Sequence, residues 1–168
     1  MKNPLLILGS ARKESDTKKV TDILFSDIKI DCIDLLDYKI DAFNYDGIYS
    51  RKDDFLELAK IILEHDQIIF ATPVYWYSMS GGMKNFFDRL TDLITIHKEM
   101  GRRLKGKEVF LVAVGASDCI PDGFENPFRS TSEYLDMKFI STYYCQSYKL
   151  DRIKKEGVDF LQKLTRIN

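Results

Sequence analysis

A short polar segment near the start of the chain carries side chains suited to binding an anion. It follows the apolar run 5–8 and reads Gly9-Ser10-Ala11-Arg12-Lys13-Glu14-Ser15-Asp16-Thr17. Ser15, Asp16 and Thr17 are favourable capping residues, so we expect a helix to begin there. The free N–H groups at a helix N-terminus attract phosphate, and hydroxyl groups and Arg12 can add to such a site. Simple helix capping, with Arg12 as a surface charge, is an equal alternative.

A second segment follows the apolar run 67–71 and contains three consecutive aromatic residues. It reads Thr72-Pro73-Val74-Tyr75-Trp76-Tyr77-Ser78-Met79-Ser80-Gly81-Gly82. Adjacent side chains point in different directions, so these three are difficult to bury together and some should face a cavity or a partner. A flat, partly apolar ligand such as an isoalloxazine ring matches them, and so does a dimer interface. We expect Gly81 and Gly82 to allow close backbone approach at the start of the next helix.

These segments lie within an alternation of short apolar runs and helical periodicity. We expect strands over residues 5–8, 30–35, 67–71, 109–114 and within 138–148, and helices from residue 15, over 55–63, over 83–93 and over 150–164. Val158 is expected among the buried residues of the last helix. Residues 36–52, rich in Asp, Tyr and Asn, are interpreted as a long connection. The alternation predicts a mainly parallel sheet covered on both faces, either flavodoxin-like or a truncated Rossmann arrangement.

The order of the elements predicts where a ligand would bind. In open α/β sheets, ligands bind beyond the carboxyl ends of the strands, near the point where strand order reverses. The loops after the first, third and fourth strands are therefore the expected site. The fourth strand runs into Gly115-Ala116-Ser117-Asp118. Gly115 suits a close approach of backbone to ligand, although it fits an ordinary turn equally well.

Composition argues against several classes of protein. The 168 residues fit one domain, which we expect to span 1–168. Lys and Arg number 25 against 26 Asp and Glu, so the basic field of a general nucleic-acid binder is missing. No apolar run has the length of a membrane span, and the opening MKNPLLILGS is too short for a signal peptide. Neither a Walker A loop nor a GxGxxG pattern is present.

The cysteines and histidines suggest no metal site. Cys32, Cys119 and Cys145 form no CxxC pair, which argues against a zinc ribbon or a cysteine-ligated cluster. Cys32 and Cys145 are expected to be buried small hydrophobic residues, and reduced thiols without an export signal indicate the cytoplasm. His65 and His97 are expected to be exposed.

Two motifs resemble those of the NADPH-dependent FMN reductase family, and they follow each other along the chain in the family's order. Thr72-Pro73-Val74-Tyr75-Trp76, Ser78-Met79 and then Lys84-Asn85-Phe86-Phe87-Asp88-Arg89 are similar to its pattern (S/T)PVYxxS(M/I) leading to (L/M)KxF(L/F/I)DR. Gly9-Ser10, Arg12, Ser15 and Thr17 are similar to its GSxRxxSxT phosphate loop. The resemblance covers most of the chain. It implies a flavodoxin-like three-layer α/β/α sandwich with a five-stranded parallel sheet of order 2-1-3-4-5.

The resemblance also implies which residues hold FMN. Ser10, Arg12, Ser15, Asp16 and Thr17 would surround the phosphate; Pro73, Val74, Tyr75, Trp76, Tyr77 and Ser78 would line the isoalloxazine and ribityl region; Gly115, Ala116 and Ser117 would close the other side of the ring. Asp16 stands where relatives usually carry Asn or Gly, and its carboxylate would repel phosphate unless it turns outward. The connection 36–52 resembles a shortened form of the segment that carries clustered cysteines in iron-sulfur flavoproteins. It has no cysteine, so no cluster is expected.

The implied activity is that of an FMN-dependent oxidoreductase with NADPH or NADH as donor. The acceptor would be a quinone, a flavin, an azo or nitro compound or a metal ion, and a homodimer with FMN near its interface is implied. Hydride transfer needs stacked rings and little acid–base chemistry, so we expect no catalytic side chain. One alternative is a flavodoxin-type electron carrier, although such carriers are usually strongly acidic. The other is an interaction module that has lost FMN, which Asp16 favours.

Overall fold

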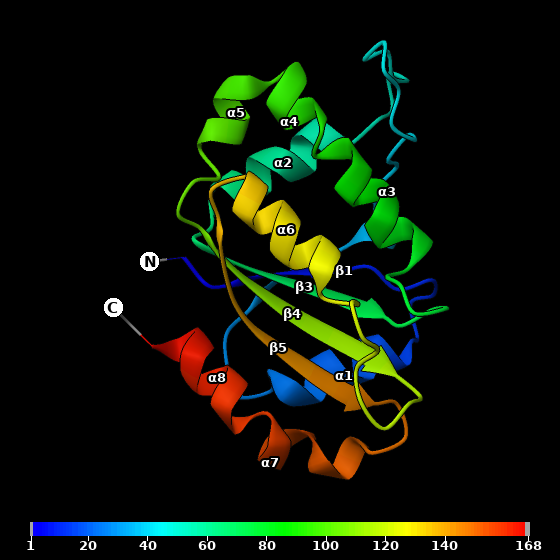
Figure 1. Ribbon diagram of the computed structural model, residues 1–168, viewed down its shortest axis with the longest axis vertical. Coiled ribbons are helices and arrows are strands. Elements are labelled where there is room, and N and C mark those ends of the chain that lie inside the picture. The colour runs from blue at the N-terminus through cyan, green and yellow to red at the C-terminus, as the bar shows by residue number, and fades with distance from the viewer. Residues whose placement is uncertain (1, 167–168) are drawn as a thin grey trace.

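The computed structural model describes residues 2–166 of the chain. Five parallel strands form one sheet in the order β2-β1-β3-β4-β5 (Figure 1). The strands are β1 (Leu5–Leu8), β2 (Asp31–Asp34), β3 (Gln67–Pro73), β4 (Glu108–Gly115) and β5 (Lys138–Gln146). The helices are α1 (Asp16–Leu24), η1 (Leu35–Asp37), α2 (Phe55–Leu63), α3 (Gly81–Arg89), α4 (Asp92–Thr95), α5 (Lys98–Arg102), α6 (Asn126–Tyr134), η2 (Leu150–Arg152), α7 (Ile153–Glu156) and α8 (Val158–Thr165). The strand order confirms the flavodoxin-like arrangement.

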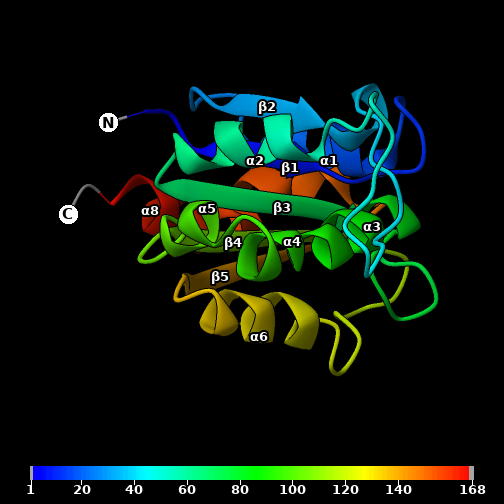
Figure 2. The same cartoon turned by 90° about the horizontal axis from the view of Figure 1, so that it is seen from above.

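Side chains alternate along the central strands, and this alternation buries both faces of the sheet. On β3, Ile68 and Phe70 enter one apolar cluster, whereas Ile69 and Ala71 enter the other. Figures 1 and 2 show the sheet between two helical layers, with α2, α3 and α6 on one side and α1, α7 and α8 on the other. Because both faces are covered, the strands read as continuous apolar runs. Within residues 2–166, no helix is long and apolar enough to cross a membrane.

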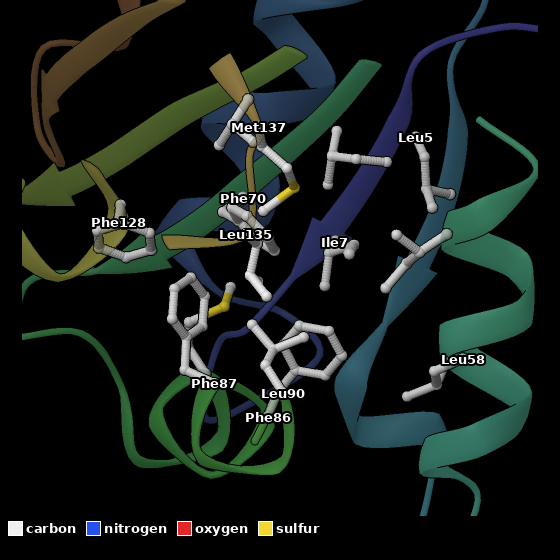
Figure 3. Close-up of a cluster of buried hydrophobic side chains, with 14 of the residues drawn as sticks. Leu5, Ile7, Leu58, Phe70, Phe86, Phe87, Leu90, Phe128, Leu135 and Met137 are labelled. Atoms are coloured by element: carbon white, nitrogen blue, oxygen red, sulfur yellow. The ribbon is translucent and has the colours of Figure 1, made fainter. Parts of the chain in front are cut away.

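Phenylalanine rings form much of the cluster beneath α3 and α6 (Figure 3). The ring of Phe87 lies 5.0 Å from that of Phe70 and 5.0 Å from that of Phe128, and both pairs meet edge to face. Such pairs contribute about 0.5–1.5 kcal/mol each beyond the area that they bury. Phe86, Phe87 and Leu90 are buried, as their helical spacing predicts. The motif that contains the two phenylalanines is therefore part of the core.

Three helical regions differ from the prediction. The helix predicted over 83–93 ends at Arg89, because hydrogen bonds between residues three apart, such as Leu90 N to Phe87 O at 3.1 Å, tighten the chain before α4 begins. The sequence does not predict α6, since Phe128 is its only buried apolar residue and leaves little periodicity. The last helix is broken at Gly157. The break separates α7 from α8 and changes which side chains face the core, so Val158 is 47% exposed instead of buried.

The predicted burial of one cysteine and exposure of one histidine are wrong. Cys32 is exposed because it lies on β2, an edge strand with one neighbour, whereas Cys145 is buried as expected. His65 is buried. Its Nδ1 lies 2.9 Å from Ile61 O and its Nε2 lies 3.1 Å from Asp31 Oδ2, so protein groups replace water around the ring.

The long connection between η1 and α2 (residues 38–54) is fixed by the buried guanidinium of Arg89. Its Nη1 and Nη2 donate to the two carboxylate oxygens of Asp53, at 2.6 and 3.0 Å. Nη1 also donates to Asp41 O at 3.0 Å, and Nε donates to Asp92 Oδ2 at 2.9 Å. In both ribbon views this connection stands beside α3 (Figures 1 and 2). One side chain therefore joins the connection to α3 and α4.

Burial strengthens this pairing. The side chains of Arg89, Asp53 and Asp92 are 1%, 7% and 2% exposed. Burial is the largest single influence on the pKa of Asp53 and would raise it. The hydrogen bonds from Arg89 and from the backbone N–H groups of Asp41 and Phe55, together with the charge of Arg89, outweigh burial and hold that pKa below its ordinary value. The ring of Tyr49 covers the guanidinium, with 3.4 Å between its centroid and Arg89 Cζ, and its hydroxyl donates to Asp92 Oδ1 at 2.9 Å. Each buried ion therefore has partners.

Replacing Arg89 by Met should lower the free energy of unfolding by about 3–5 kcal/mol, because it leaves two buried carboxylates unpaired. Urea denaturation at neutral pH measures this. Because the folded-state pKa of Asp53 is lowered, its stabilising contribution is present above the unfolded-state pKa and is lost as pH falls through the folded-state value. The difference between variant and wild type should therefore shrink in acid.

Arg102→Met is the matched control, since the ion pair between Arg102 and Glu99 is exposed. We expect it to change the free energy of unfolding by less than about 1 kcal/mol. Equal effects of the two substitutions would contradict the structural role assigned to Arg89.

Candidate functional site

A cleft of about 350 Å³ lies at the carboxyl ends of the central strands. Its lining comes from the loops after β1 and β3, from the end of β4 and from the residue after β5. The lining residues are Ala11, Arg12, Ser15, Asp16, Thr17, Pro73, Val74, Tyr75, Val114, Gly115, Ala116 and Ser147. A larger hollow of about 670 Å³ lies at the opposite, amino ends of the strands. The smaller cleft is the one where the three predicted loops meet.

One end of the cleft is built for an anion. Ser15 caps α1, since its hydroxyl oxygen accepts the N–H of Lys18 at 3.1 Å. The backbone N–H groups of Asp16 and Thr17 have no hydrogen-bond partner among residues 2–166. Arg12 lies beside them on the cleft wall. Two free N–H groups, a helix dipole and an arginine thus belong to the same end of the cleft.

Two other charged groups of this segment, Lys13 and Asp16, are already paired. Lys13 Nζ lies 2.5 Å from Asp37 Oδ1 and 2.9 Å from Asp34 Oδ2, and hydrogen bonds to these two carboxylates raise the pKa of Lys13. Asp16 is on the rim of the cleft, and its carboxylate lies 3.3 Å from Lys19 Nζ, one turn along α1. Ser10 is buried outside the lining and donates to Arg12 O at 3.0 Å. It supports the loop from beneath.

The loop after β3 is tied to the loop after β1 through Ser80. The Ser80 hydroxyl caps α3 by accepting Met83 N at 3.1 Å, and it donates to Gly9 O. Ser80 N in turn donates to Thr72 Oγ1 at 3.1 Å. A Cβ on Gly9 would lie 2.7 Å from the Met83 side chain, so glycine is needed for this close approach. The first turn of α3 therefore sets the distance between the two loops.

The three aromatic residues divide between the cleft and solvent. Tyr75 lines the cleft, whereas Trp76 and Tyr77 are 93% and 73% exposed and lie outside its lining, as does Ser78. Tyr75 and Ser78 exchange two backbone hydrogen bonds, of 2.9 and 3.0 Å, which close a two-residue hairpin turn. Trp76 and Tyr77 have φ values of 47° and 66°, a left-handed conformation that Asn and Gly adopt far more readily. The turn is strained by its own side chains.

Gly81 and Gly82 differ from expectation. A Cβ on either would meet nothing within 4 Å, so no neighbour within the chain requires glycine at the start of α3. Both residues are exposed. The predicted close approach is therefore absent within the described chain.

The end of β4 forms the opposite wall of the cleft. Gly115 and Ala116 line it, and Ser117 follows in an exposed loop. A Cβ on Gly115 would lie 2.7 Å from Tyr144 Oη, so the approach that requires glycine here is that of a β5 side chain. Ser147 N donates to Gly115 O at 2.9 Å. This wall therefore depends on the end of β5.

Most of the residues predicted for the site meet at this cleft. Several residues that support it were not predicted from the sequence. Ser80 carries a recognisable signal, a serine directly before a helix. No such signal marks Tyr144, Gln146 or Ser147, because only the pairing of β5 with β4 brings them to this end of the sheet. Five of the predicted residues lie outside the lining: Ser10, Trp76, Tyr77, Ser78 and Ser117. For all the predicted residues, contact with a ligand stays a prediction.

Related sequences agree on one family. A family model described as NADPH-dependent FMN reductase matches residues 3–147. The chain is 30% identical over 110 residues to the uncharacterized NAD(P)H oxidoreductase YrkL of Bacillus subtilis (strain 168), which covers 59% of this chain and 62% of the relative. It is 31% identical over 74 residues to the putative NAD(P)H-dependent FMN-containing oxidoreductase YwqN of the same strain. That alignment covers 43% of this chain and 41% of the relative. The chain thus spans about two to three fifths of the length of these relatives.

Solved structures share the fold. The Trp repressor binding protein from Bacillus subtilis superposes with a TM-score of 0.75 and 20% identity, covering 98% of this chain and 99% of that one. General stress protein 14 from Treponema denticola, solved in complex with FMN, gives a TM-score of 0.67 and 18% identity, covering 97% and 98%. At such identities the likeness shows the fold alone. The match over residues 3–147 shows more: the chain belongs to the NADPH-dependent FMN reductase family.

Proposed function

We propose that the chain binds FMN in the cleft and passes electrons from NADPH or NADH to a small acceptor. The acceptor would be a quinone, a flavin, an azo or nitro compound or a metal ion. One observation carries the proposal: the free N–H groups of Asp16 and Thr17 converge with Arg12 at one end of a cleft whose remaining walls are mainly apolar. That donor set fits a phosphate, and the walls fit a flat ring.

The chain's own residues would bind and orient the cofactor rather than transfer protons. FMN, when bound, supplies a ring that can accept hydride from a nicotinamide and deliver electrons onward. Arg12, Thr17 and the start of α1 would hold the phosphate end. Val74 and Tyr75 on one wall, and Gly115 and Ala116 on the other, would hold the ring and exclude water. No side chain in the lining needs to act as an acid or base for this role.

The proposal also includes a location in the cell and an oligomeric state. Reduced cysteines favour the cytoplasm, as Cys32 and Cys119 are exposed free thiols. The exposed turn at Trp76 and Tyr77 favours a homodimer, because aromatic side chains are enriched at interfaces between subunits. The open space around Gly81 and Gly82, next along the chain, would admit the backbone of a second copy.

The purified protein should be yellow, and NADPH or NADH added without oxygen should bleach its flavin absorbance. Return of the colour when a quinone is added would complete the electron transfer. A yellow protein that neither nicotinamide bleaches would favour a flavodoxin-type carrier instead. A colourless protein that fails to quench the fluorescence of added FMN would contradict both the reductase and the carrier, and would favour an interaction module.

Arg12→Ala should raise the dissociation constant for FMN by about tenfold to a hundredfold, because a charged hydrogen bond contributes about 1.5–3 kcal/mol. Quenching of flavin fluorescence measures the constant. Lys18→Ala is the matched control, since it removes the same charge close by, on α1, but Lys18 pairs with Asp22 and lies outside the lining of the cleft. Unchanged affinity in Arg12→Ala would place Arg12 outside the phosphate site.

Trp76→Asn should weaken the homodimer by about 30-fold or more, as expected for an interface tryptophan that contributes about 2 kcal/mol. Asparagine tolerates the left-handed conformation, so the thermal stability of the monomer should not fall. Sedimentation equilibrium measures the first effect and a melting curve the second. Tyr134→Asn, at an exposed aromatic on α6, is the control.

Trp76 is the only tryptophan of the chain, so its fluorescence reports on the turn alone. Its emission should shift to the blue as protein concentration rises through the dissociation constant of the dimer. Emission typical of water at every concentration, together with a monomer in sedimentation, would refute the interface.

A further inference from the structure

The loop that follows β4 (residues 116–119, here the β4 loop) has little backbone support of its own. Its residues are exposed, and among residues 2–166 its backbone groups form no hydrogen bond with other backbone groups. The next backbone hydrogen bond along the chain is Phe124 N to Pro121 O at 3.1 Å. Loops of this kind open easily unless side chains restrain them.

Two side chains of β5 supply the restraint. The hydroxyl of Tyr144 donates to Ser117 O at 2.8 Å. Gln146 Nε2 donates to Asp118 Oδ1 at 2.9 Å and to the hydroxyl of Tyr148 at 2.9 Å. Since the two residues are two apart on a strand, both point to the same face, under the β4 loop. Successive positions of the loop are thus held from one strand.

The restraint reaches the cleft through the end of β4 and the first residues of the β4 loop. Tyr144 Oη lies 2.7 Å from where a Cβ of Gly115 would be, so the phenol packs against the last residue of β4. Gly115 and Ala116 line the cleft, and Ala116 joins that contact to the restrained Ser117. Gln146 is only 8% exposed. Neither Tyr144 nor Gln146 lies in the lining, so both would act on the cleft only through the loop.

The phenol of Tyr144 keeps its donor. Burial is the main cause that raises the pKa of Tyr144 above its ordinary value. The O–H bond is therefore intact across the neutral range, and the hydrogen bond to Ser117 O does not depend on pH there.

We propose that Tyr144 and Gln146 are positioning residues that fix the β4 loop as one wall of the FMN cleft. This inference rests on the proposed function for its ligand, but not for its geometry. Loss of either side chain should free the loop and weaken the cofactor's binding without removing any group that touches the cofactor.

The test uses Tyr144→Phe and Gln146→Leu in the full chain, with two readouts. The first is the rate of cleavage before Asp118 by an Asp-specific protease, measured on protein stripped of FMN. We expect both variants to be cut at least about fivefold faster, as loss of one hydrogen bond of about 1 kcal/mol implies. The second is the dissociation constant for FMN, which should rise by about fivefold to tenfold.

Tyr143→Phe is the matched control. Tyr143 is the neighbouring residue on β5 and belongs to the opposite apolar cluster. Its hydroxyl contacts Ile153 O, at 3.5 Å, and the thiol of Cys145, and neither belongs to the β4 loop. It should change neither readout. A melting curve for each variant shows whether the fold is intact, and Tyr144→Phe removes a single oxygen, so it keeps the test available if Gln146→Leu unfolds.

Three results separate the possibilities. Wild-type cleavage and affinity in both variants would overturn the proposal, and so would faster cleavage with unchanged affinity, which would make the loop irrelevant to the cleft. A wild-type protein that takes up no FMN would contradict the proposed function instead. The cleavage rates on stripped protein would still decide whether the two side chains fix the loop.

Discussion

Burial of both faces of the sheet is the constraint from which the site follows. Ile68 and Ile69, adjacent on β3, enter opposite apolar clusters, so neither face of the central strands can carry polar chemistry. The polar side chains of the central strands, such as Gln67 and Thr72 on β3, stand at the ends of these strands. At the carboxyl ends, the chain turns into helices whose first N–H groups point back toward the strands, which makes this end receptive to anions. The position of the cleft is thus a consequence of how the strands are buried.

The loops at that end need support that the sheet does not provide. Ser80 joins the loops after β1 and β3 by capping α3 and donating to Gly9 O. Tyr144 and Gln146 hold the β4 loop from β5. Farther out, Arg89 fixes the long connection beside α3. Each support is a buried or half-buried polar group with its partners in place, and such groups favour one arrangement of the loops over others.

Local signals predict much of this fold, and tertiary contacts account for the rest. The apolar runs of β1 and β3 and the cap at Ser15 can be read directly, as can the core face with Phe86 and Phe87. The buried state of His65 cannot, since its partner Asp31 is 34 residues away. Tyr144 reaches Ser117 across 27 residues for the same reason. Sequence places the three loops at one edge, but the side chains that hold them become visible only when the strands are paired.

The backbone conformation of the turn at Trp76 and Tyr77 lowers the stability of the fold. Two bulky residues in the left-handed region cost about 1–2 kcal/mol each, whereas Asn-Gly would close the same hairpin without strain. The two backbone hydrogen bonds of the turn do not require aromatic side chains. Trp76 is 93% exposed, so burial within the chain does not compensate for the strain. Such strain persists where something outside the local backbone requires the residue. The proposed interface between two copies would supply such a requirement, because the turn lies directly after Tyr75, which lines the cleft.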